Sequence, residues 1–152
     1  LFANSGAKVT GVDTDINKIR DISNVQVSED IVSPVDLRNA IGRGFLPISS
    51  IPKSVRFDAF IVCVPTPLKD GSPDTVFVEQ AALMISKHLE PNNQGDPFSI
   101  VLESTVSPGT TRRIFFEKAE QLGLMLDKDY YLGFSPERVD PRNKFWTAKD
   151  CI

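Results

Sequence analysis

Short apolar runs that alternate with helical stretches are the feature that most constrains how this chain can fold. The runs have the length of β-strands and lie at 8–12, 59–64, 98–103 and 130–134. In the stretches between them, apolar residues recur at three- and four-residue spacing, which is typical of helices with one buried face. These stretches are 15–22, 33–41, 76–88 and 110–122. Strands separated by helices predict an α/β fold with a doubly wound, mainly parallel sheet and right-handed crossovers.

The second helical stretch carries the clearest start signal. Ser33 is a favourable N-cap, Pro34 suits the first turn, and Asp36 follows the cap by three residues. Gly42 and Gly44 then predict where this helix ends.

Length and charge narrow the class of protein. The chain has 152 residues, enough for one domain with a core but too few for two full ones. Its net charge of -3 provides no basic surface for nucleic acid or for a membrane. No apolar run approaches the ~20 residues of a membrane span, and residues 1–5 lack the features of a signal peptide. We therefore expect a cytoplasmic protein with neither a nucleic-acid nor a membrane partner.

The cysteines and the histidine predict neither a disulfide nor a metal site. Two cysteines, Cys63 and Cys151, are too few for a disulfide framework, and Cys63 lies in a strand run where a thiol is expected to be buried. His88 is the single histidine and ends a helical stretch, so we expect it at a solvated helix terminus. Because the acidic residues are not clustered, no set of metal ligands remains.

Polar side chains follow three of the predicted strands. Thr66 stands between two prolines after 59–64, Ser104 and Thr105 follow the next run, and Glu137 lies in a loop after 130–134. Because the carboxyl ends of parallel strands share one edge of a sheet, we expect these side chains to converge on one crevice. A hydroxyl of Ser104 or Thr105 would there bond a water or a developing oxyanion.

Each of these residues also has a purely structural interpretation. Thr66 fits a proline-stabilised loop, and Thr105 or Ser107 could cap the following helix. Glu137 fits a solvated surface, where most glutamates lie.

Asp13 ends the strand predicted at 8–12. Dinucleotide-binding folds place at this point the acid that accepts hydrogen bonds from the adenosine ribose. A carboxylate there repels a 2′-phosphate, so the predicted cofactor is NAD and not NADP. The alternative is a turn aspartate, since Asp15 follows closely.

Four motifs occur in one order along the chain: Val9-Thr10-Gly11-Val12-Asp13, Pro65-Thr66-Pro67, Ser104 to Thr111, and Phe134 to Pro141. Together they resemble the nucleotide-sugar 6-dehydrogenases, the family of UDP-glucose and UDP-N-acetylhexosamine dehydrogenases. The last motif is most similar to the branch that acts on UDP-N-acetylglucosamine or UDP-N-acetylmannosamine. The resemblance implies that a sugar C6 alcohol is oxidised twice to a carboxylate, with two NAD as acceptors and a thioester between the two steps.

The resemblance also implies roles for individual residues. Lys18 matches a basic residue five places after Asp13, and the cofactor-binding set becomes Asp13, Lys18, Thr66, Ser104 and Thr105. The implied catalytic residues are Thr105, which helps to orient a water, and Glu137, the acid/base of thioester hydrolysis. The nucleophilic cysteine, its lysine and its aspartate would lie beyond residue 152. The implied partner is a UDP-sugar, and the intact protein would be a homodimer or a larger homo-oligomer.

Two positions depart from the family's pattern. Pro141 stands where some UDP-glucose enzymes carry a second carboxylate, and Arg142 replaces the glycine that usually follows this proline. The second departure bears on the backbone conformation of this loop, which a glycine would leave less restricted.

The beginning of the chain is expected to be the end of a first helix, stopped by Gly6. A Rossmann-like domain opens with a strand and a glycine-rich phosphate turn, and neither is found. We therefore expect residues 1–152 to be an N-terminally truncated NAD-binding domain, without the central and UDP-binding domains, that alone binds NAD weakly and lacks activity. In a crystal of this chain alone we also expect the strands at 8–12 and 59–64 to be rearranged, separated by a gap, or bridged by a strand from a neighbouring molecule.

Other functions fit part of these observations. A UDP-glucose 6-dehydrogenase, or a 3-hydroxyacid or 6-phosphogluconate type dehydrogenase, would share the architecture and the acid at Asp13. A non-catalytic nucleotide-binding module would explain the absent phosphate turn.

Overall fold

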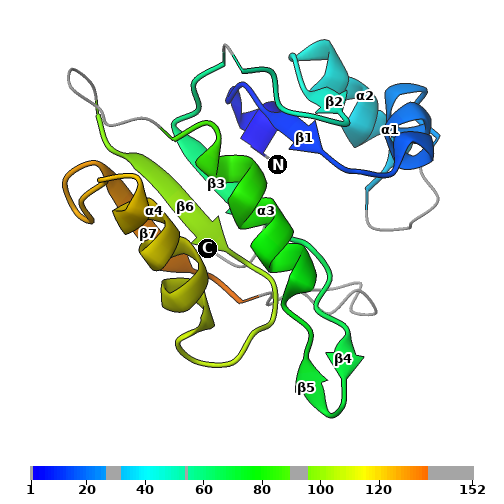
Figure 1. Cartoon of the computed structure of the whole chain (residues 1–152). Helices are drawn as coiled ribbons and strands as arrows, with labels where there is room; N and C mark the ends of the chain where they lie inside the picture. Colours follow the sequence, from blue (N-terminus) through cyan, green and yellow to red (C-terminus); the bar gives the residue numbers. More distant parts are fainter. Residues whose placement is uncertain (1, 27–31, 54, 90–95, 137–152) are drawn as a thin grey trace. The chain divides into compact units, whose positions relative to one another are not determined.

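The structure is a computed structural model that describes residues 2–26, 32–53, 55–89 and 96–136 (Figure 1). The chain divides into two compact units that meet in the sequence at residues 52 and 53. Each unit contains a parallel sheet and helices, as expected for an α/β fold.

The first unit holds a small two-stranded sheet. Its elements are η1 (Phe2–Ser5), β1 (Thr10–Val12), α1 (Ile16–Ser23), α2 (Pro34–Gly42) and β2 (Leu46–Ile48). Strands β1 and β2 are parallel, with Gly11 opposite Pro47. A side chain at Gly11 would begin only 2.8 Å from the Phe45 ring, so a larger residue at this strand position would require the ring to shift. Strand β2 was not predicted.

The helix signals of the first unit are confirmed. The Ser33 hydroxyl accepts a hydrogen bond from the Asp36 N–H at 3.0 Å, and α2 ends at Gly42. Gly44 follows with φ +94°, a conformation that favours glycine. Gly6 has φ +96° directly after η1, so it ends a helical turn as expected.

The second unit is built on a three-stranded parallel sheet. In chain order its elements are β3 (Ala59–Val62), β4 (Leu68–Lys69), β5 (Ser72–Pro73), α3 (Val76–Ser86), β6 (Phe98–Leu102), the π-helical turn η2 (Arg112–Phe116), α4 (Glu117–Gln121) and β7 (Tyr130–Phe134). The sheet order is β3-β6-β7. In register, Val62 lies opposite Leu102, which lies opposite Phe134, so the three strands end together at their carboxyl ends.

The core of this unit lies between the sheet and its helices. Alternate residues of β3 and β6 are buried, and they pack with buried residues of α3 and η2–α4. Phe60, Phe98 and Tyr130 form a row across the three strands, with ring centroids 6.1 and 5.8 Å apart. On the opposite face Ile61 and Tyr131 keep 42% and 50% of their surface exposed.

Cys63 is exposed, which contradicts its expected burial. The strand alternation explains the difference, because Phe60 and Val62 point to the core and the odd-numbered residues point to the opposite face.

His88 also differs from expectation. Its side chain is partly buried at the end of α3, with a buried Nδ1 that lacks a hydrogen-bond partner within the described residues.

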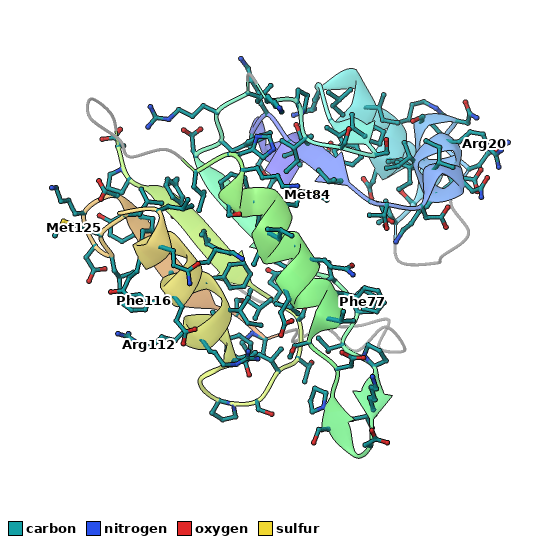
Figure 2. All side chains as sticks on the ribbon, viewed as in Figure 1. Arg20, Phe77, Met84, Arg112, Phe116 and Met125 are labelled. Carbon is teal, nitrogen blue, oxygen red and sulfur yellow. The ribbon has the colours of Figure 1, made fainter. Side chains whose placement is uncertain are left out.

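The helix predicted at 110–122 contains a π-helical turn followed by α4. On this helix the Arg112 guanidinium lies 4.2 Å from the centroid of the Phe116 ring, and both residues are labelled in Figure 2.

The hairpin β4–β5 was not predicted. Its turn places Asp70 and Gly71 at φ +52° and +78°, which matches the Asp-Gly preference of type I′ turns.

Within the described ranges, β1 pairs only with β2, and β3 pairs only with β6. No helix in this part of the chain is long and apolar enough to cross a membrane.

Candidate functional site

Asp13 follows β1 directly and is held by three hydrogen-bonding or ionic contacts. Its N–H donates to the Ile48 carbonyl at 3.2 Å, which extends the β1–β2 ladder by one residue. Its Oδ1 accepts from the Asp15 N–H at 3.0 Å, and its Oδ2 lies 2.9 Å from the Lys18 Nζ. Asp15 in turn caps α1 by accepting from the Asn17 N–H at 2.9 Å. The structure therefore brings Asp13 and Lys18 together at the start of a helix, with the Asp13 side chain 32% exposed.

The Asp13 carboxyl is stabilised in its charged form. Partial burial alone would raise its pKa, but the hydrogen bond from the Asp15 N–H and the charge and hydrogen bond of Lys18 outweigh burial. The pKa of Asp13 therefore lies below its ordinary value. A carboxylate that stays ionised at neutral pH, with part of its surface open, can accept hydrogen bonds from the hydroxyls of a ribose.

We expect Lys18→Ala to raise the pKa of Asp13 toward its ordinary value, because this change removes both the ammonium charge and its hydrogen bond. Titration of the Asp13 carboxyl carbon by NMR measures the change. Arg20→Ala is the matched control, because Arg20 lies on the same helix and pairs with Asp21 instead. An unchanged Asp13 titration in Lys18→Ala would contradict this account of the pair.

A second group of candidate residues lies at the carboxyl ends of β3 and β6, within the second unit. The Thr66 hydroxyl donates to the Thr105 carbonyl at 2.7 Å, and the Ser104 hydroxyl donates to the Val64 carbonyl at 2.6 Å. The structure thus brings Thr66, Ser104 and Thr105 together. Ser104 is buried, whereas the Thr105 side chain is exposed.

Glu137 lies outside the described residues. Strand β7 ends at the same sheet edge as β6, and just past it the Ser135 N–H donates to the Leu102 carbonyl at 3.0 Å. Asp13 and Lys18 belong to the first unit.

A pair at this edge was missed by sequence reasoning. The Cys63 thiol donates to the Glu103 carboxylate, with Sγ 3.2 Å from Oε2. The signal was present in the alternation of β3 and β6, because both residues follow their strands at odd-numbered positions on the face opposite the core.

The loop at 104–111 contains two hydroxyl residues, Thr105 and Ser107, that could have capped the helix that follows. Neither Thr105 nor Ser107 makes a side-chain hydrogen bond that caps the following helix within the described residues. The Thr105 hydroxyl is therefore available to a ligand. The described residues contain no group of side chains suited to hold a metal ion.

The parallel β-α-β connections within the two units are those of a Rossmann-like fold. The chain belongs to the UDP-glucose/GDP-mannose dehydrogenase family, whose NAD binding domain matches residues 1–149. This membership favours the nucleotide-sugar dehydrogenases over the 3-hydroxyacid or 6-phosphogluconate types.

Named relatives agree with this assignment. The chain is 30% identical to the UDP-N-acetyl-D-mannosamine dehydrogenase of Pyrococcus horikoshii over 148 residues, which is 95% of this chain and 34% of that protein. Among solved structures, the UDP-N-acetyl-mannosamine dehydrogenase Cap5O of Staphylococcus aureus matches with a TM-score of 0.81 at 30% identity, over 92% of this chain and 33% of that chain. GDP-mannose dehydrogenase from Pseudomonas aeruginosa matches with a TM-score of 0.78 at 25% identity, over 91% and 33%. The chain therefore spans about a third of the length of these relatives.

The residues present fit NAD, the cofactor of this family's domain. The Asp13 carboxylate suits the diol of an unphosphorylated ribose, and its partial exposure leaves room for that contact. Its negative charge opposes the 2′-phosphate of NADP.

Proposed function

We propose that this chain is the NAD-binding part of a longer UDP-N-acetylhexosamine 6-dehydrogenase, which oxidises the C6 alcohol of its substrate to the uronate. The observation that carries the proposal is the grouping of Thr66, Ser104 and Thr105 at one sheet edge. It occurs in a chain that is similar, over more than nine-tenths of its length, to UDP-N-acetyl-D-mannosamine dehydrogenases. In this proposal the central and UDP-binding domains belong to the remainder of the protein.

The proposed reaction has two oxidations and one hydrolysis. When bound, NAD supplies the acceptor for a hydride from C6. In the first oxidation the alcohol loses a hydride and a proton and becomes an aldehyde. A cysteine thiol of the full-length protein then adds to the aldehyde to give a thiohemiacetal, and this loses a second hydride and its hydroxyl proton to give a thioester. Water cleaves the thioester, so that the carboxylate forms and the thiol is regenerated.

In this proposal the residues of this chain bind the cofactor, orient the water that attacks the thioester and accept a proton from it. Asp13 and Lys18 would hold the adenosine ribose, and Asp13 would do so as the ionised acceptor. The exposed Thr105 hydroxyl would orient the attacking water, and Glu137 would accept a proton from it. Thr66 and Ser104, predicted from the sequence to bind the cofactor, lie beside Thr105, and their hydroxyls donate to backbone carbonyls. That the full-length protein is a homodimer or larger homo-oligomer in the cytoplasm remains a prediction.

The substrate class can be tested with the full-length protein. Purified enzyme is supplied with NAD and, in separate reactions, UDP-N-acetylmannosamine, UDP-N-acetylglucosamine or UDP-glucose, and the uronate products are measured by mass spectrometry. We expect one of the two N-acetylated sugars to give the highest kcat/KM. A higher kcat/KM for UDP-glucose would assign the protein to the other branch of its family.

A further inference from the structure

Two side-chain hydrogen bonds join the loops that follow β3 and β6, and we call them the loop staples. One runs from the Thr66 hydroxyl to the Thr105 carbonyl and the other from the Ser104 hydroxyl to the Val64 carbonyl. The donor–acceptor distances of 2.7 and 2.6 Å are at the short end for O–H···O hydrogen bonds. The two staples cross between the loops in opposite directions.

The loop staples continue the sheet where the backbone ladder can no longer do so. The last ladder bond between these strands runs from the Glu103 N–H to the Val62 carbonyl at 2.9 Å. Beyond it, Pro65 and Pro67 have no N–H to donate. In this segment the Thr66 and Ser104 hydroxyls donate to the Thr105 and Val64 carbonyls.

The first staple engages the single proton of the Thr66 hydroxyl in a bond to the protein. The acceptor is the backbone of Thr105, whose own side chain is exposed and makes no hydrogen bond within the described residues. The backbone of Thr105 is thus fixed while its hydroxyl is left for a ligand.

We infer that Thr66 is a positioning residue for Thr105: its hydroxyl holds the Thr105 backbone so that the Thr105 hydroxyl meets the reacting groups. This inference rests on the proposed function, and it gives Thr66 a role that acts through Thr105 instead of through a hydrogen bond donated to the cofactor. It predicts that loss of the Thr66 hydroxyl affects turnover more than NAD affinity, because positioning errors act on the reacting geometry.

The test compares Thr66→Val with Thr66→Ser in the full-length enzyme. Thr66→Val keeps the shape but removes the donor, and we expect kcat to fall about 10-fold while the KM for NAD changes less than about 2-fold. Thr66→Ser restores the donor and is expected to recover most of the kcat. Ser107→Ala is the control, because Ser107 is exposed in the loop that carries Thr105 and makes no side-chain hydrogen bond within the described residues.

A double-mutant cycle separates positioning from direct contact. If Thr66 acts through Thr105, adding Thr66→Val to Thr105→Val should lower kcat less than about 2-fold further, because the positioned hydroxyl is already gone. The inference would be overturned if the double variant lost kcat by the product of the two single-variant factors and also had a raised KM for NAD. That result would show that Thr66 contacts the cofactor itself.

Hydrogen–deuterium exchange provides a readout that needs no turnover. Peptides that span the 103–112 loop are expected to exchange faster in Thr66→Val than in Thr66→Ser or in the wild type. If the wild-type enzyme is active but Thr66→Val leaves the exchange of these peptides unchanged, the positioning role of Thr66 is overturned and the proposed function is not. A wild-type enzyme that oxidises no nucleotide sugar would instead overturn the proposed function, and the exchange rates would still show whether the Thr66 hydroxyl holds the loop.

Discussion

Glu137→Gln in the full-length enzyme is expected to slow hydrolysis of the proposed thioester by about 10²–10⁴-fold, the usual contribution of one positioned acid/base. Glutamine keeps the size of the side chain but cannot accept the proton of the attacking water. The steps up to thioester formation should be less affected, so a covalent sugar–enzyme species should accumulate. Intact-protein mass spectrometry after mixing with NAD and substrate would detect it as an added mass.

The control for Glu137→Gln is Glu120→Gln, which removes the same charge from an exposed position on α4. It should leave turnover unchanged. If Glu137→Gln kept the wild-type turnover and showed no adduct, Glu137 would have no part in the mechanism. The path of the chain supports the choice of residue, since Ser135 is hydrogen-bonded to Leu102 at the sheet edge where Ser104 and Thr105 follow.

Asp13→Ser is expected to lower the preference for NAD over NADP by about 10–100-fold, which corresponds to the loss of one hydrogen bond to a charged group. Two effects act in the same direction. The ribose of NAD loses a charged acceptor, and the 2′-phosphate of NADP no longer meets a carboxylate. The ammonium of Lys18, now 2.9 Å from Asp13 Oδ2, would remain to pair with that phosphate. The ratio of kcat/KM for the two cofactors measures the change.

Asp21→Ser serves as the control for Asp13→Ser. Asp21 lies on the adjacent helix α1 and pairs with the exposed Arg20, so its loss changes the net charge equally without reaching the proposed ribose site. The control should retain the wild-type cofactor preference. A wild-type enzyme that used NAD and NADP equally well would contradict the role given to Asp13.

Much of the fold follows from local signals in the sequence. The cap of α2 was predicted from Ser33 and Asp36 because N-capping depends on residues within one helical turn. Strand β2 was missed because it has three residues with Pro47 at its centre, and proline is a poor sign of a strand. The hairpin had a clear signal in Asp70-Gly71, which was not used.

The candidate site was less predictable, because it depends on contacts between distant segments. The order of strands and hydroxyl residues predicted that Thr66 and Thr105 lie at comparable strand ends. It did not predict which group the Thr66 hydroxyl bonds to, or that the Thr105 hydroxyl stays exposed. The partner of the Thr66 hydroxyl depends on which carbonyls remain unpaired where two loops meet, 39 residues apart in the sequence. Cys63 was expected to be buried because it lies in an apolar run. Such a run does not show which face of its strand is covered, and Cys63 is exposed.

The central claim is that the full-length protein removes two hydrides from one C6 alcohol. A substrate with deuterium at both C6 positions of UDP-N-acetylmannosamine tests it directly, with deuterated NADH and uronate counted by mass spectrometry. The proposal predicts two deuterated NADH for each uronate formed and no deuterium left at C6. One deuterated NADH for each product, or deuterium retained at C6 after oxidation elsewhere on the sugar, would contradict it.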